Sequence, residues 1–96
     1  LLSEDGVIVV SAVIDSSTGY NLCAPEIHSR GFVFVKESAE LFREAEDIVI
    51  RILDKYADSR KRDINSLKGK IKDEMLRFMY EKTKRSPVII PVIQEI

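Results

Sequence analysis

The sequence predicts an α+β domain in which a small three-stranded sheet carries two helices on one face, with the element order β-β-α-α-β. Three observations lead to this prediction. Apolar, β-branched runs of strand length stand near both ends of the chain, two amphipathic helical patterns fill the middle, and turn-forming residues separate these segments. The length of 96 residues gives room for one domain, which we assign to residues 1–96.

The first strand is predicted over residues 6–15, which read GVIVVSAVID. Turn-forming residues follow over 16–19, and Gly19 suits a position with positive φ. We predict a second strand over 20–24, which pairs with the first as a hairpin with a loop of about four residues. Pro25 has no amide hydrogen, so it is expected to end this pairing or to lie on its open edge.

Residues 25–31 are predicted to be irregular, and the apolar run over 32–35 to resume the strand, with Gly31 at a bulge. Cys23 would lie in an apolar strand, where a buried, inert thiol is the usual state. His28 is expected in a loop, as a partly exposed side chain that forms a hydrogen bond.

The first helix is predicted to begin near Ser38, whose hydroxyl can cap it, and to continue to about residue 57. Its apolar residues recur at spacings of three and four, as expected for one buried face. They are Leu41, Phe42, Ala45, Ile48, Val49, Ile52, Leu53 and Tyr56.

The second helix is predicted to begin after Asp63 or Asn65, since either side chain can cap it. Gly69 lies inside this helix at a cost of about 1 kcal/mol relative to alanine, so we expect it to face solvent or a close neighbour. Pro87 ends the helix. The apolar stripe comprises Ile64, Leu67, Ile71, Met75, Phe78 and Met79.

The first strand and the last, predicted over 88–93, are apolar at both parities. Two helices cover one face of a sheet, and an antiparallel sheet with its other face in water normally alternates apolar and polar residues. We therefore predict that the second face is buried against another domain or a second copy of the chain. The predicted interface residues are Val7, Val9, Val13, Val88, Ile90 and Val92, or the set of opposite parity, because the sequence does not say which parity faces the helices.

The net charge of −1 conceals an uneven distribution of charge. Residues 1–59 carry five basic and eleven acidic side chains, whereas residues 60–85 carry ten basic and four acidic ones. The basic segment suggests contact with nucleic-acid phosphates. The candidate contacts are Arg30, Lys82, Lys84 and Arg85.

Two other interpretations of these cations remain open. Lys82, Lys84 and Arg85 can form a solvated helix end, where the helix dipole favours positive charge. Arg30 can form a structural salt bridge, for example with the acidic first helix. We expect no exposed aromatic side chain among these cations to act as a platform for base stacking.

The residue inventory disfavours intrinsic chemistry. One cysteine excludes an internal disulfide, and one histidine, with only Glu26 at ligand spacing from it, argues against a metal site or other cofactor. No nucleophile has an evident base, so no catalytic residue is predicted. No apolar run approaches the roughly 18 residues that cross a bilayer, and the opening LLSEDG has no signal pattern. We expect a cytoplasmic segment of a longer protein with no membrane partner.

Three stretches carry a resemblance to a known family. They are LSEDGVIVVSAVID at 2–15, APEIHSRGFVFVKES at 24–38 and RFMYEKTKRSPVIIPVIQEI at 77–96. In this order and at this spacing they cover nearly the whole chain, and together they resemble the C-terminal domain of ribonuclease J. His28 departs from the pattern, because many relatives carry an apolar residue there.

The resemblance implies a parent chain in which a metallo-β-lactamase domain, interrupted by a β-CASP domain, precedes this module. Such parents are zinc-dependent 5′–3′ exo- and endoribonucleases of RNA processing and decay. Their metal ligands lie in HxHxDH-type motifs upstream, none of which occurs here, so zinc and catalysis are expected only in the parent's other domains.

For this chain the resemblance implies a non-catalytic accessory domain that supports oligomer or domain assembly and full activity. Its partners would be the parent's catalytic domains, further copies of the protein, and RNA through the parent enzyme. The alternative is an RNA-binding module that guides the substrate to the catalytic domains.

Overall fold

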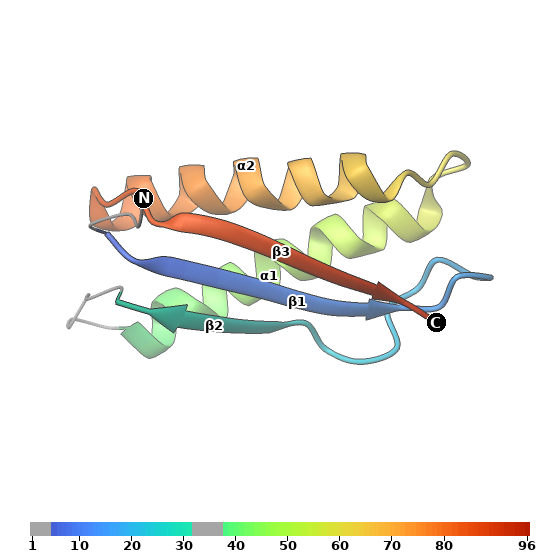
Figure 1. Ribbon diagram of the computed structural model, residues 1–96, viewed down its shortest axis with the longest axis horizontal. Coiled ribbons are helices and arrows are strands. Elements are labelled where there is room, and N and C mark those ends of the chain that lie inside the picture. Colours follow the sequence, from blue (N-terminus) through green and yellow to red (C-terminus); the bar gives the residue numbers. More distant parts are fainter. Residues whose placement is uncertain (1–4, 32–37) are drawn as a thin grey trace.

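The computed structural model describes residues 5–31 and 38–96, which form three strands and two helices (Figure 1). Along the chain they are β1 (Val7–Ile14), β2 (Glu26–Arg30), α1 (Ser38–Asp58), α2 (Ile64–Thr83) and β3 (Val88–Glu95). The predicted order β-β-α-α-β is therefore confirmed. The sheet has the order β2-β1-β3 and is mixed, since β2 runs antiparallel and β3 parallel to β1.

The helices cover one face of this sheet, as predicted (Figure 1). The even-numbered residues of β1 point toward them and are buried, and Ile89 of β3 joins the same core. Both predicted apolar stripes supply the rest of the core. Their buried members are Leu41, Ala45, Val49, Ile52 and Leu53 of α1, and Leu67, Ile71, Met75, Phe78 and Met79 of α2. None of the helices over the described ranges is long and apolar enough to cross a membrane.

The position predicted for the second strand is wrong. Residues 20–24 contribute only an isolated bridge between Asn21 and Ile14, and β2 lies in the segment expected to be irregular. The chain turns back on itself over 15–20, where the amide of Gly19 donates to the carbonyl of Asp15 at 2.8 Å. Regular pairing begins only at Glu26, directly after Pro25, which has no amide hydrogen to donate.

This shift also moves neighbouring residues. Cys23 lies in the connection before β2 and is exposed, so the prediction of a buried thiol is wrong. The predicted strand over 32–35 and the capping side chain of Ser38 lie outside the part of the chain whose side chains the structure describes.

Asp63 is the residue that caps α2. Its side chain accepts hydrogen bonds from the Asn65 amide at 3.3 Å and the Ser66 hydroxyl at 2.8 Å. At the other end, Lys84 adopts the left-handed conformation, and its amide donates to the Tyr80 carbonyl at 2.8 Å. Gly69 is exposed, and a Cβ atom added to it would meet no heavy atom within 4 Å, which confirms that it faces solvent.

Strand β3 forms one edge of the sheet. The amides of Val88 and Ile96 donate to the carbonyls of Gly6 and Ile14, both at 2.9 Å. Because the hydrogen-bonding direction alternates along a strand, the nitrogen of Pro91 points away from β1. The proline therefore removes no hydrogen bond from the β1–β3 ladder.

Candidate interaction surfaces

The face of the sheet that the helices leave uncovered, here called the open sheet face, is largely apolar. The strand register places Val9 beside Ile90 and Val7 beside Val88 on this face. The β3 side chains Val88, Ile90 and Val92 are 40%, 42% and 46% exposed. The opposite parity set is buried beneath the helices or packed against the core. The structure therefore places the first of the two predicted sets outward: Val7, Val9, Val13, Val88, Ile90 and Val92.

Strand β2 borders this apolar area with polar side chains. Glu26, His28 and Arg30 pair with Ser11, Val9 and Val7 and lie on the same face. His28 Nε2 is 3.0 Å from Glu26 Oε1, and both side chains are exposed. An accessible, hydrogen-bonding His28 is thus confirmed, although it lies in a strand and not in a loop.

The expected salt bridge between Arg30 and the first helix does not form. Within 5–31 and 38–96, Arg30 has no carboxylate partner and is exposed. The reason is its parity, because Arg30 pairs with Val7 on the open sheet face while α1 lies on the other face. Arg30 is therefore available to a partner that approaches this face.

All four predicted RNA-contacting residues lie at the end of the molecule where β1 and β3 begin (Figure 1). Two of them are held by carboxylates. Lys82 Nζ is 3.5 Å from Glu44 Oε1, and Arg85 Nη1 is 3.5 Å from Asp5 Oδ1. These exposed pairs connect α2 to α1 and to the start of β1, and each is worth at most about 1 kcal/mol.

The basic end of α2 also presents an aromatic ring that the sequence interpretation missed. Tyr80 is 51% exposed, and Lys84 Nζ lies 5.2 Å from its ring centroid. The expectation that no exposed aromatic accompanies these cations is therefore wrong. The sequence contains a signal for this exposed ring. Tyr80 follows Leu76 by four residues, which places both on one side of the helix, and neither belongs to the predicted apolar stripe. In the structure Leu76 is 38% exposed.

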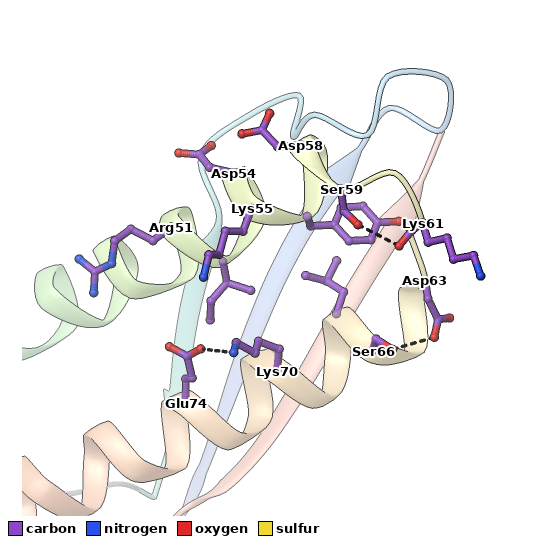
Figure 2. Close-up of a pocket in the computed structure, with 13 residues that line it drawn as sticks. Arg51, Asp54, Lys55, Asp58, Ser59, Lys61, Asp63, Ser66, Lys70 and Glu74 are labelled. Carbon is purple, nitrogen blue, oxygen red and sulfur yellow. Dashed lines mark hydrogen bonds and ion pairs between the residues drawn. The ribbon is translucent and has the colours of Figure 1, made fainter.

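A groove of about 570 Å³ separates the last turns of α1 from the first turns of α2 (Figure 2). Ile52, Tyr56 and Leu67 supply its apolar lining. Burial, followed by the negative charge of Glu95, raises the pKa of the Tyr56 phenol above its ordinary value. The positive and negative charges around the groove are equal in number, so the lining favours neither an anionic nor a cationic ligand. The basic residues are Arg51, Lys55, Lys61 and Lys70, and the acidic residues are Asp54, Asp58, Asp63 and Glu74.

No metal-binding constellation occurs in the part of the chain that the structure describes. Residues 5–31 and 38–96 contain no group of three or more His, Cys, Asp or Glu side chains placed to hold an ion. The Glu26–His28 pair alone supplies fewer ligands than a zinc site requires.

Comparison with known proteins agrees with the resemblance noted in the sequence. The family described as the ribonuclease J C-terminal domain matches residues 1–96. Proteins named Ribonuclease J 2 from Staphylococcus epidermidis and Staphylococcus aureus are each 40% identical to this chain over 96 residues. The match covers 100% of this chain but only 17% of each relative's length. This chain therefore belongs to the family of ribonuclease J C-terminal domains.

Proposed function

We propose that this chain is a non-catalytic accessory domain of a ribonuclease J, and that its open sheet face packs against another domain of the parent or against a second subunit. The observation that carries the proposal is the apolar, uncovered side of β1 and β3. Domains rarely leave a contiguous apolar area of this kind in water unless it serves as an interface.

The arrangement of the open sheet face supports this role. Covering exposed branched side chains contributes roughly 25 cal/mol per Å² of apolar surface removed from water. The polar row of β2 lies beside the apolar area, as the polar rim of a protein interface does. Both helices lie on the far side of the sheet, so neither can cover these residues.

In this proposal the chemistry belongs to the rest of the parent protein. The parent would be a zinc-dependent 5′–3′ exo- and endoribonuclease that acts in cytoplasmic RNA processing and decay. This domain would support its assembly and full activity without contributing a metal ligand or catalytic group. RNA would reach the active site through the parent's catalytic domains.

Sedimentation equilibrium over a concentration series tests whether the chain associates with itself. Ile90→Lys places a charge in the middle of the exposed apolar row of β3 on the open sheet face, whereas Leu76→Lys places one on α2, away from this face. The two residues are matched in size and exposure, at 42% and 38%. We expect Ile90→Lys to weaken association and Leu76→Lys to leave it unchanged.

If the chain is a monomer at all concentrations, its partner would be the remainder of the parent. The same two variants are then titrated against the parent truncated before this domain, with calorimetry as the readout. Retention of both kinds of association by a folded Ile90→Lys variant would contradict the proposal.

A further inference from the structure

The exposed ring of Tyr80 lies between two cations on the flank of α2. Arg77 precedes it by three residues and Lys84 follows it by four, and both spacings place side chains next to each other on a helix. Leu76, one turn earlier, extends the exposed apolar surface. We call these four residues the Tyr80 patch: Leu76, Arg77, Tyr80 and Lys84.

In the part of the chain that the structure describes, the two cations of the Tyr80 patch differ from Lys82 and Arg85 in lacking carboxylate partners. Lys82 is paired with Glu44, and Arg85 is paired with Asp5. Over the described ranges, neither Arg77 nor Lys84 forms an ion pair. Their charge is therefore available to an anion that approaches the ring.

The backbone at Lys84 provides a second observation. Its φ of 60° and ψ of 24° are the left-handed conformation that ends α2, where glycine is the residue most often found. A lysine is strained at this position, and the cap itself needs only the backbone amide that donates to Tyr80. The capping geometry does not explain the lysine side chain, which instead lies over the Tyr80 ring.

We propose that the Tyr80 patch binds single-stranded nucleic acid, with RNA as the form suited to a ribonuclease. A nucleobase stacks on the exposed tyrosine ring and displaces the Lys84 side chain from it, and Arg77 and Lys84 contact the phosphates on either side of the base. The ligand is single-stranded because bases within a duplex do not offer a free face for stacking. This surface is separate from the open sheet face and does not depend on the proposed assembly role.

The test is fluorescence anisotropy at low salt with a labelled short oligouridylate, with the equivalent duplex as a second probe. We expect the single strand to bind more tightly than the duplex. Tyr80→Ala should weaken binding roughly tenfold, as expected for one lost base–aromatic stack, while Tyr80→Phe retains the ring face and most of the affinity.

Lys84→Gly separates binding from stability. Glycine relieves the left-handed strain, so thermal unfolding should be unchanged or shift upward, while affinity for the oligouridylate falls several-fold. Lys55→Ala, at the C-terminal end of α1, is the control for loss of one exposed positive charge and should change affinity less.

Three results would each overturn the proposal. The first is equal affinity of wild type and Tyr80→Ala for the single strand, and the second is an equal loss in Lys55→Ala and Lys84→Gly. The third is a Tyr80→Ala variant that loses protein association instead of nucleic-acid binding. This last measurement also distinguishes a failure of the proposed nucleic-acid site from a failure of the proposal that the open sheet face is an interface.

Discussion

The side chain of Arg62 lies directly against Gly19. Arg62 Nη2 donates to the carbonyl of Ser17 at 3.4 Å, and Nη1 donates to the carbonyl of Ala57 at 3.3 Å. One guanidinium thus joins the turn after β1 to the C-terminal end of α1. The glycine makes this possible, because a Cβ atom there would lie 2.5 Å from Cδ of Arg62.

Gly19→Ala should therefore destabilise the domain. The φ of +83° disfavours any side chain, and the added methyl group collides with Arg62, so we expect a loss of roughly 2 kcal/mol or more. Urea unfolding monitored by circular dichroism measures the change. In the double variant Gly19→Ala/Arg62→Ala the collision is removed. Its stability should therefore recover only the part lost to the collision, and not the part lost to the unfavourable φ. Wild-type stability of the single variant would show that Arg62 does not hold this turn.

Gly69→Ala should have the opposite effect. This glycine lies within α2, its conformation is helical, and nothing stands within 4 Å of the added methyl group. We expect a gain of about 0.5–1 kcal/mol, because alanine loses less conformational freedom than glycine in a helix. The same urea titration checks it. A loss of stability would mean that the position is closely packed and not exposed to solvent.

Val9→Ala and Val10→Ala compare adjacent positions on opposite faces of β1. Val10 is fully buried beneath the helices, whereas Val9 lies on the open sheet face. Val10→Ala should cost roughly 2 kcal/mol through lost burial and a cavity, and Val9→Ala distinctly less. The unfolding experiments require a concentration at which the chain is monomeric. Equal losses, or the reverse order, would contradict the assigned parity.

The domain should lose stability in acid partly through two aspartates. Hydrogen bonds from the Ser17 and Ser66 hydroxyls hold the pKa values of Asp15 and Asp63 below the ordinary value of 3.8. The unfolded chain then binds more protons than the folded chain as pH falls below about 3.8, so this contribution to stability is present above that pH and is lost below it.

The variant Asp15→Asn/Asp63→Asn tests this contribution. Asparagine keeps one acceptor oxygen for the Ser17 and Asn65 amides but does not titrate, so the decrease of the melting temperature from neutral to acidic pH should be shallower than in wild type. Thermal unfolding over a pH series provides the comparison. An identical decrease in both proteins would assign the acid sensitivity to other carboxylates.

The helices were predictable because their signals are local. Apolar spacings of three and four identified the buried faces of α1 and α2, and Asp63 was one of two capping candidates. The second strand was misplaced because turn-forming residues at 16–19 suggest a tight hairpin. In the structure the chain makes a longer excursion, and regular strand pairing begins only after Pro25.

The exposed side chains were harder to predict than the core. Tyr80 and Cys23 are both exposed, although tyrosine is usually partly buried in folded proteins and cysteine is among the most often buried residue types. The exposure of Tyr80 depends on which flank of α2 the other elements leave open. That of Cys23 depends on where β2 begins.

The sequence by itself determined the order of elements, the two helical faces and the presence of more apolar strand surface than two helices can cover. Only the tertiary structure decided that Val9 and Ile90 point outward while Val10 points inward. The physical reason is that β1 is apolar at both parities. Its sequence therefore lacks the alternation of apolar and polar residues that would show which side chains face the core. The choice arises when the helices pack on one face, and the six outward apolar residues of β1 and β3 are those that remain uncovered.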